Sequence, residues 1–382
     1  MDFKLTEDQQ MFQKMVHDFA TKEIEPIAAR IDNEEEFPSE CIKKMADLGL
    51  FGVTISEKYE GSGGDSIHLA IASEEISRAS AGIGTIYLAS LSLACYPIYK
   101  FGTEEQKRRF VIPHARGEKL CAFSLTEPGA GSDVASLEMT AVRQGNEYVL
   151  NGTKIFITNG AEADTVVTFA TIDKSKRHRG ITAFIVERGT PGFSLSRKED
   201  KLGIRASSTA ELLYEDCHVS VENRLGEEGQ GFQVAMEAID SSRITVAAQA
   251  VGIARAAFEA SLNFAKDRQQ FGGPIANNQA IQWKLADMAT YVNAARLLTY
   301  QAAYLKDQGL PFVKEAAMAK LFAGEAAMNI TTQAIQVHGG YGYTKEYPVE
   351  RFFRDAKITE IYEGTSEMQR MTIAKNLLRE TK

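Results

Sequence analysis

The segment "EYVLNGTKIFITNG", residues 147–160, decides which class of fold the chain can adopt. Apolar and polar residues alternate in it with a period of two, which is typical of a strand with one buried face. Asn151-Gly152 separates two such alternating runs, and this pair is a strong signal for a hairpin turn. The segment therefore predicts two antiparallel strands in the middle of the chain.

The regions around this segment extend the pattern in both directions. Further strands are expected at "DTVVTFATI" (164–172), "GITAFIVERG" (180–189) and "AELLYEDCHV" (210–219). Before about residue 120 the apolar period is helical, with breaks at "FPSE" and "YEGSGGDS". After residue 227 amphipathic helices are expected at roughly 230–266, 277–308 and 312–338. The order predicts an α+β fold with an N-terminal helical domain (1–118), a middle β domain (119–226) and a C-terminal helical domain (227–382).

Charge and cysteine content limit the partners and the compartment. The net charge of −8 argues against nucleic acid as a main partner, because phosphate binding needs a basic face. The four cysteines are far apart and form no CxxC pair, which favours a reducing compartment. Residues 1–20 resemble an amphipathic helix capped at Thr6 more than a targeting peptide. We therefore expect a cytoplasmic bacterial protein more than a mature mitochondrial one.

Residues 79–99, "ASAGIGTIYLASLSLACYPIY", carry no charge and are long enough to cross a membrane. Small and hydroxyl-bearing residues are frequent in this stretch, however, and Pro97 breaks it. A buried helix is the better interpretation, and no membrane insertion is expected. A helix without charges would also form a suitable wall for an apolar substrate pocket.

Several common catalytic motifs are absent from the sequence. No GxGxxG follows a strand, and there is no Walker loop, HExxH or GxSxG. The six histidines are scattered, so no metal site is predicted. A nicotinamide-dependent Rossmann enzyme, a P-loop enzyme and a zinc hydrolase are all disfavoured.

Two segments of the β region combine glycine, hydroxyl groups and an aromatic ring. In "LTEPGAGSD", residues 125–133, two glycines and a proline form a fixed loop that offers the hydroxyls of Thr126 and Ser132. In "IFITNG", residues 155–160, Phe156 and Thr158 should face the same side of a strand. Each segment alone is weak evidence for a ligand site.

Three further motifs lie in the C-terminal region. "RQQFG" (268–272) and "QVHGGYGY" (336–343) each end a helix. In "IYEGTSEMQR" (361–370), Glu363 lies between apolar residues and a helix start, where Ser366 and Gln369 have the spacing of a capping box. Solvation alone does not account for a carboxylate between apolar residues, so Glu363 is a candidate functional residue.

Taken together and in this order, the five motifs resemble those of the acyl-CoA dehydrogenase family of flavoproteins. The resemblance covers nearly the whole chain. It implies an acyl-CoA dehydrogenase-like fold, with an N-terminal helical domain, a middle β-barrel-like domain and a C-terminal four-helix bundle. It also implies FAD as cofactor, an acyl-CoA as substrate, electron-transferring flavoprotein as electron acceptor, and a homotetramer built as a dimer of dimers.

The resemblance assigns roles to individual residues. Those expected near the flavin are Phe123, Leu125, Thr126, Ser132, Phe156 and Thr158. Those expected at the FAD of the neighbouring subunit are Arg268, Phe271, Gln279, Gln336, Gly339 and Gly340. At the start of the last helix, whose N-terminus suits a phosphate-bearing ligand, the cofactor-binding residues are Thr365, Ser366 and Glu367.

The implied reaction is α,β-dehydrogenation of a short- or medium-chain acyl-CoA to the trans-2-enoyl-CoA, with hydride transfer to flavin N5. Glu363 is the implied base for the α-proton. The residues expected to contact the substrate are Ser132, Asp240, Arg243, Tyr362 and Gly364. In the isovaleryl and long-chain branches the base comes from the helix that matches "AIDSSRI" (238–244), where this chain has serines. This departure supports Glu363.

Three alternatives stay open. A glutaryl-CoA-type enzyme would need a cation on the 79–99 helix, near Gly84, and that helix has no Arg or Lys; Arg78 precedes Gly84 by more than one turn. A flavin oxidase on the same scaffold would differ in how the reduced flavin meets oxygen. A non-catalytic nucleic-acid-binding relative is opposed by the acidic charge and by Glu363. The sequence leaves the acyl chain length open.

Overall fold

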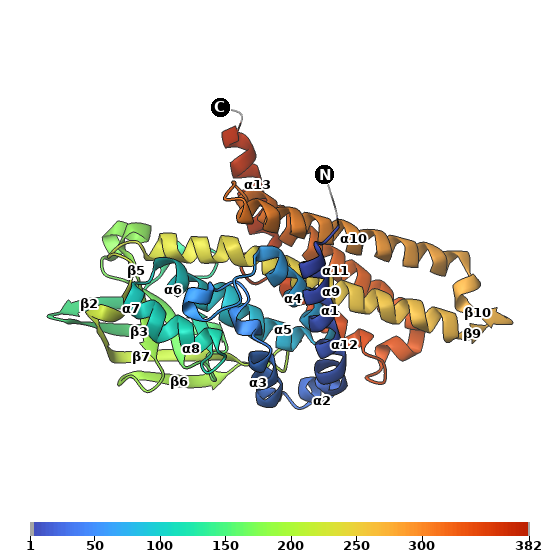
Figure 1. The fold of residues 1–382 in the computed structure, drawn as a ribbon, viewed down its shortest axis with the longest axis horizontal. Helices are drawn as coiled ribbons and strands as arrows, with labels where there is room; N and C mark the ends of the chain where they lie inside the picture. The colour runs from blue at the N-terminus through green and yellow to red at the C-terminus, as the bar shows by residue number, and fades with distance from the viewer. Residues whose placement is uncertain (1–3, 381–382) are drawn as a thin grey trace.

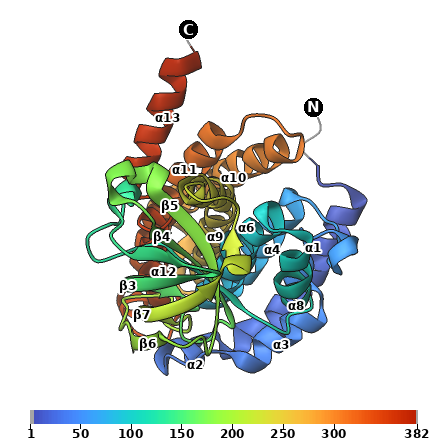
Figure 2. The same ribbon diagram turned by 90° about the vertical axis from the view of Figure 1, so that its left-hand side faces the viewer.

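The computed structural model describes residues 4–380, in which the main sheet lies at one end of the molecule and two helical regions pack against each other beside it (Figures 1 and 2). The N-terminal helices are α1 (Glu7–Phe19), α2 (Ala28–Asn33), α3 (Ser39–Asp47), α4 (Ser66–Ala79), α5 (Ala81–Leu88), α6 (Tyr96–Phe101), α7 (Glu104–Gln106) and α8 (Ile112–Ala115). The C-terminal helices are α9 (Gly231–Asp267), α10 (Gln279–Asp307), α11 (Val313–His338), α12 (Val349–Ala356) and α13 (Ser366–Glu380).

The first helix begins where the sequence predicts. The hydroxyl of Thr6 accepts a hydrogen bond from the N–H of Gln9, and the Gln9 side chain accepts one from the N–H of Thr6. This reciprocal capping box satisfies two N–H groups that the helix itself leaves unpaired. Val16 is fully buried, so the apolar face of α1 packs on the core.

The uncharged stretch is a core helix. Residues Ala81–Phe101 form one helix that could cross a membrane by length and composition alone, but 89% of its apolar window is buried inside the protein. A π-helical segment, Ala89–Cys95, leads into α6. Pro97 follows directly after this π-helical segment, as the second residue of α6, and the chain stays helical to Phe101.

The middle of the chain forms an eight-stranded sheet with the order β6-β7-β3-β2-β4-β5-β8, and β1 pairs with β4. Its strands are β1 (Cys121–Ser124), β2 (Thr140–Gln144), β3 (Glu147–Thr158), β4 (Thr165–Thr171), β5 (Ile181–Glu187), β6 (Phe193–Lys198), β7 (Thr209–Ser220) and β8 (Arg224–Leu225). A separate pair, β9 (Gln269–Gln270) and β10 (Gly273–Pro274), follows α9. The three strands predicted outside residues 147–160 thus appear as β4, β5 and β7.

The predicted hairpin turn at Asn151-Gly152 is wrong. Both residues lie inside β3, a continuous strand of 12 residues, and the turn is at Gly145-Asn146, between β2 and β3. Gly152 marks a bulge, where the register of β3 against β7 shifts. A Cβ at Gly152 would lie 2.8 Å from side-chain atoms of Met139. Glycine is therefore required because Met139, the residue before β2, approaches the backbone of β3 closely, and no turn is present at this position.

Helix α9 has 37 residues and connects the sheet to the far end of the C-terminal helices (Figure 1). It packs against α10 and α11 and also against α4 of the N-terminal region. Because α9 runs from the sheet to the β9–β10 pair, it can present side chains at both ends of the molecule.

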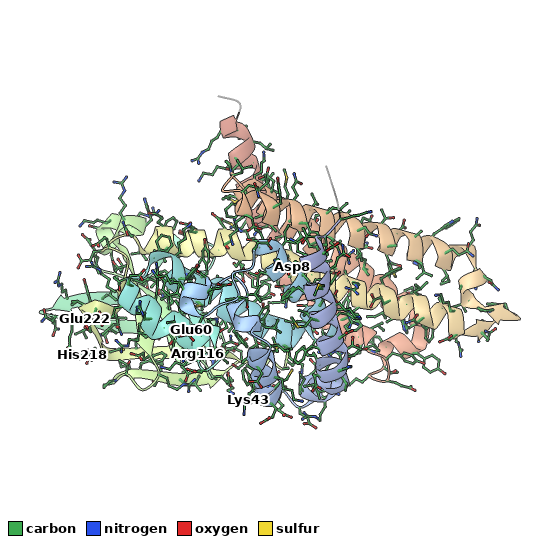
Figure 3. All side chains as sticks on the ribbon, in the orientation of Figure 1. Asp8, Lys43, Glu60, Arg116, His218 and Glu222 are labelled. Atoms are coloured by element: carbon green, nitrogen blue, oxygen red, sulfur yellow. The ribbon has the colours of Figure 1, made fainter. Side chains whose placement is uncertain are left out.

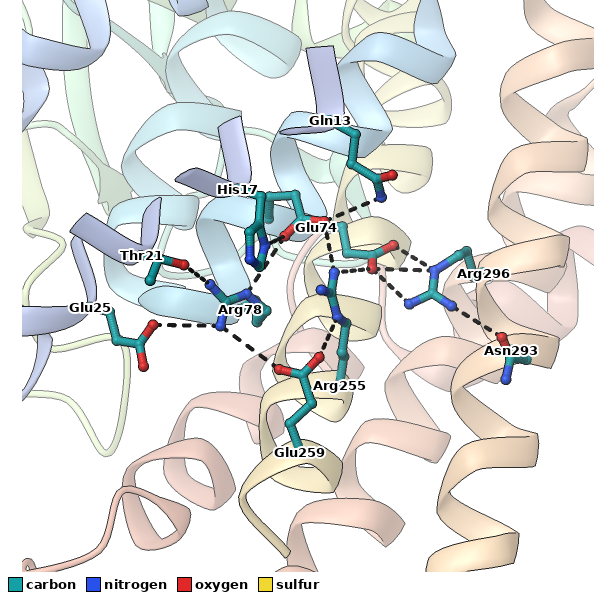
Figure 4. Close-up of polar contacts among 11 residues, drawn as sticks. Gln13, His17, Thr21, Glu25, Glu74, Arg78, Arg255, Glu259, Asn293 and Arg296 are labelled. Carbon is teal, nitrogen blue, oxygen red and sulfur yellow. Dashed lines mark hydrogen bonds and ion pairs between the residues drawn. The ribbon is translucent and has the colours of Figure 1, made fainter. Parts of the chain in front are cut away.

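A buried cluster of charges fixes α4 against its neighbours (Figure 4). Glu74 and Glu75 of α4 are 2% and 1% exposed. Arg255 of α9 reaches Glu74 at 3.1 Å and Glu75 at 2.7 Å. Arg296 of α10 binds Glu74 at 2.8 Å, and His17 of α1 binds Glu75 at 2.9 Å. Since each buried carboxylate has at least two partners, the cluster ties four helices together.

Candidate active site

One cavity lies where the ends of β1 and β3 meet α5, α9 and the loop before α13. It is lined by Thr85, Leu88, Ala89, Leu93, Phe123, Leu125, Thr126, Phe156, Ile157, Thr158, Ile239, Tyr362 and Glu363. The structure thus brings together residues from three motifs that are up to about 240 positions apart in the sequence. The uncharged helix forms one wall, as the sequence predicts.

The end of β3 is shaped by a second bulge. The register against β7 shifts between Lys154 and Ile157, and Phe156 has a left-handed φ of 59°. The bulge turns Phe156 and Thr158 to the cavity, and the Phe156 side chain remains 61% exposed. An aromatic ring left open beside hydroxyl groups forms a surface on which a planar polar ring can lie.

A buried lysine that the motifs did not reveal fixes the loop after β1. Lys154 is fully buried, and its amine donates to the carbonyl of Leu125 at 2.9 Å and to the Glu127 carboxylate at 2.8 Å. Glu127 also accepts bonds from the N–H groups of Glu138 and Met139. Burial lowers the pKa of Lys154 to about 8, although Glu127 opposes this. The pair holds Thr126 at the cavity.

The loop that carries Glu363 is strained and strongly held. Glu363 has a φ of 53°, which is costly for a residue with a Cβ. Lys320 of α11 is 2% exposed, and its amine donates to the carbonyls of Thr359 at 3.0 Å and Gly364 at 2.8 Å. The Gln369 amide also donates to the Gly364 carbonyl, at 2.7 Å. These bonds fix the backbone on both sides of the carboxylate.

The capping box predicted for Ser366 and Gln369 does not form. Thr365 precedes the first helical residue, and its hydroxyl accepts a bond from the N–H of Met368 at 3.4 Å. The Gln369 side chain is instead engaged by the carbonyls of the Glu363 loop. Tertiary contacts therefore replace the local cap. Glu367 lies exposed in the first turn of α13.

The Glu363 carboxylate is in an unusual electrostatic environment. Its withdrawal from water raises its pKa to about 7. A hydrogen bond from the Ser242 hydroxyl and the charges of Lys320 and Arg243 oppose this rise. A carboxylate with a pKa near neutrality in a cavity has the properties required of a general base.

Two residues expected to contact substrate lie beside this carboxylate. Arg243 of α9 is 7% exposed and binds Asp240 at 2.5 Å. Its guanidinium would be 3.7 Å from a Cβ placed on Gly364, whose φ is 95°. Gly364 therefore lies between the base and a cation. Ser132, by contrast, is exposed and does not line the cavity.

The cavity wall at Tyr362 is closed by a chain of polar contacts. The Tyr362 hydroxyl donates to the side-chain carbonyl of Gln249. The Gln249 amide in turn donates to the Thr85 hydroxyl at 2.8 Å and to the Ala81 carbonyl at 3.1 Å. Gln249 is fully buried within α9, and no sequence motif marks it.

The remaining predicted cofactor residues form a second group at the other end of α9. Arg268, Gly339 and Gly340 line a separate cavity, together with Tyr341. The other members are exposed, and they are Phe271, Gln279 and Gln336. From residue 242 to residue 268 the chain advances 26 residues (268 − 242), which is roughly 39 Å along α9. One chain therefore holds the two groups far apart.

Three parts of the chain match domains of a single family. Residues 6–118 match the acyl-CoA dehydrogenase N-terminal domain, residues 122–217 the middle domain and residues 229–378 the C-terminal domain. A short-chain specific acyl-CoA dehydrogenase of Clostridium acetobutylicum is 51% identical over 379 residues, which cover 99% of this chain and 100% of the relative.

Solved structures agree with this match. Butyryl-CoA dehydrogenase from Megasphaera elsdenii is 49% identical and superposes with a TM-score of 0.98, covering 99% of this chain and 100% of that one. A structure from work on the electron transferring flavoprotein of Acidaminococcus fermentans is 50% identical, with the same TM-score and the same coverage. The chain belongs to the acyl-CoA dehydrogenase family.

Proposed function

We propose that the protein dehydrogenates short, uncharged acyl-CoA thioesters, with Glu363 as the base that takes the α-proton. The observation that carries this proposal is the position of a carboxylate with a pKa near 7 in the same cavity as Phe156, Thr126 and Thr158. The family is FAD-dependent, and this chain is an oxidoreductase that acts on CH–CH groups.

The residues of the cavity fit a flavin. Phe123, Leu125 and Phe156 offer apolar and aromatic surface, while Thr126 and Thr158 offer hydroxyls for the polar edge of a ring. Bound FAD would supply the acceptor for the hydride that leaves the β-carbon. The residues of this chain would hold the ring, exclude water and accept the proton.

The proton goes to Glu363. The C–H bond at the α-carbon breaks, its proton is taken by the carboxylate, and its electron pair forms the new double bond as the hydride leaves the β-carbon. A base with a pKa near the working pH combines adequate basicity with a substantial ionised fraction. Gly364 lacks a Cβ, so the thioester can approach the backbone beside the base.

The shape of the cavity supports a short acyl group. Tyr362 and Thr85 of the lining are both held by hydrogen bonds to the buried Gln249, and we infer that this fixed wall limits the length of the acyl chain. The lining contains no cation that could neutralise a distal carboxylate. A dicarboxylic acyl group would therefore bury an unpaired charge, which costs several kcal/mol.

The position expected for a carboxylate-binding cation, near Gly84, corresponds to Thr85 in the structure. A Cβ on Gly84 would lie 2.1 Å from the Ser77 hydroxyl of α4, so this position faces a neighbouring helix and Thr85 faces the cavity. Arg78 donates to Thr21 and pairs with Glu75. It is absent from the cavity lining, which agrees with the sequence expectation.

A homotetramer completes the proposal. The second group of cofactor residues, around Arg268 and Gly339, is too far along α9 to reach the same flavin nucleotide as Glu363. It would therefore serve a neighbouring subunit. Exposed Trp283, Tyr291 and Tyr304 on α10 give that helix an apolar surface suited to subunit contact.

We also place electron-transferring flavoprotein as the acceptor of the electrons, and the bacterial cytoplasm as the compartment. The high similarity to the Acidaminococcus structure supports the acceptor. The four cysteines are free and buried, which fits a reducing compartment. Reduction of purified electron-transferring flavoprotein by butyryl-CoA, dependent on this enzyme, tests the acceptor directly.

The deciding experiment compares turnover of butyryl-, hexanoyl- and glutaryl-CoA at equal concentration, under air, with and without an electron-accepting dye. We expect butyryl-CoA to be best and glutaryl-CoA to be slower by about 10³-fold, as a buried unpaired charge requires. Turnover should depend on the dye. Fast turnover under air alone would indicate an oxidase, and preference for glutaryl-CoA would overturn the substrate assignment.

A further inference from the structure

We propose that Ser242 is a positioning residue for the base, and that its hydroxyl keeps the Glu363 carboxylate ionised and oriented in the substrate-free enzyme. This inference rests on the proposed role of Glu363. Ser242 is fully buried on α9, and its hydroxyl donates to Oε2 of Glu363. The two residues are 121 positions apart in the sequence, so only the fold brings them together.

The Ser242 hydroxyl has a second acceptor within reach. The carbonyl of Ile239, one turn earlier on α9, lies 3.1 Å from the Ser242 oxygen. A serine has a single O–H, so it can donate to Glu363 or to Ile239 but not fully to both. When Glu363 is ionised, the charge favours donation to the carboxylate. When Glu363 has taken a proton, the hydroxyl can rotate to Ile239, and no buried donor is left unpaired.

The other charged groups around Glu363 act differently. The Lys320 amine of α11 is bonded to backbone carbonyls, and Arg243 of α9 is paired with Asp240. The Tyr362 hydroxyl is directed to Gln249. Within residues 4–380, Ser242 is the side chain that donates a hydrogen bond directly to the Glu363 carboxylate. The hydrogen bond from Ser242 therefore stabilises Glu363 when it is ionised and is lost when Glu363 is protonated.

Removing the hydroxyl should shift the ionisation of the base. A hydrogen bond to a charged group stabilises that form, and its loss should move the midpoint by about one pH unit. In Ser242→Ala we expect the acid limb of kcat/KM to move to higher pH by that amount. Well below the midpoint, kcat/KM should fall about tenfold, and at high pH it should approach the wild-type value.

The neighbouring serine provides a matched control. Ser241 is also buried on α9, but its hydroxyl accepts a bond from the Lys306 amine at 2.6 Å and makes no contact with Glu363. Ser241→Ala removes the same atom from the same helix. We expect its acid limb to coincide with that of the wild type. An equal shift in both variants would show that the effect comes from α9 packing, and would overturn the proposal.

A second measurement does not depend on activity. The infrared carbonyl band of protonated Glu363, assigned by its loss in Glu363→Gln, can be titrated in wild-type and Ser242→Ala protein. We expect its midpoint to rise by about one pH unit in Ser242→Ala. An unchanged midpoint would overturn the proposal even if turnover falls. If Glu363→Gln keeps normal turnover, the base assignment fails, while the infrared midpoint still decides whether Ser242 controls this carboxyl.

Discussion

Two carboxylates of this protein are withdrawn from water with opposite results. Glu75 is 1% exposed, and burial acts to raise its pKa, but Arg255 and His17 outweigh burial and lower it. The Glu363 carboxylate is also withdrawn from water, and its pKa rises to about 7. Glu75 has a guanidinium at 2.7 Å, whereas Glu363 has a hydroxyl and more distant cations. Partners, more than depth, decide whether a carboxylate serves stability or proton transfer.

The largest effect is expected when the negative charge of Glu363, which has no directly bonded cation within residues 4–380, is removed. Glu363→Gln keeps the shape of the side chain, so we expect the variant to fold and to bind FAD and acyl-CoA. Turnover should fall by about 10²–10⁴-fold, because general-base loss has effects of that size. Stopped-flow flavin reduction by butyryl-CoA measures this. Near-normal reduction would place the base elsewhere, with Asp240 to be tested next.

The next effect concerns Glu74 and Glu75, and the test removes their shared partner, Arg255. Arg255→Met leaves Glu74 and Glu75 buried with fewer cations, and breaking such a pair destabilises a protein by about 3–5 kcal/mol. We expect a lower unfolding midpoint, and unchanged kcat in the molecules that remain folded. Arg255→Lys keeps the charge and should recover part of the loss. A wild-type midpoint for Arg255→Met would contradict the role given to the cluster.

The pH dependence of activity and of stability should separate the two sites. Glu363 must be ionised to act, so kcat/KM should fall as pH drops through about 7, and by about 100-fold two units lower. Glu75 has a lowered pKa, so its stabilisation is present above the ordinary glutamate pKa and is lost only as pH falls through that lower value. At pH 5 the enzyme should be folded, slow and fully recoverable on return to pH 8. Unfolding that parallels the loss of activity would contradict this separation.

The smallest effect is expected from a charge pair on the surface. Arg116 and Glu60, labelled in Figure 3, are 2.5 Å apart, but both side chains are more than two-fifths exposed. Exposed pairs of this kind contribute little to stability, because solvent screens the two charges. Arg116→Ala should therefore leave the unfolding midpoint and kcat close to the wild-type values, as thermal unfolding and steady-state assays can show. A loss as large as that of Arg255→Met would mean that ion pairing matters here regardless of burial.

The sequence alone determined features that depend on local pattern. The N-terminal cap at Thr6 and the long helices α9, α10 and α11 follow from residue type and apolar period, which neighbouring residues set. The strands β4, β5 and β7 follow in the same way. The strands β1, β2 and β6 were not predicted: β1 and β2 are short, and the alternation in β6 covers only four residues of a largely exposed strand. The cavity residues named beforehand came from the family resemblance that the order of motifs carries, and they are Phe123, Leu125, Thr126, Phe156, Thr158, Tyr362 and Glu363.

Only the tertiary structure decided how those residues are supported. Gly152 has the neighbours of a turn residue, but the approach of Met139 makes it a bulge within a strand. Gln369 has the spacing of a cap, but the carbonyls of the Glu363 loop engage it. Lys320 and Ser242 lie on other helices and reach that loop only in the folded chain. Such contacts join residues that are far apart in the sequence. A local pattern of residue types therefore does not indicate which distant residue a side chain will contact.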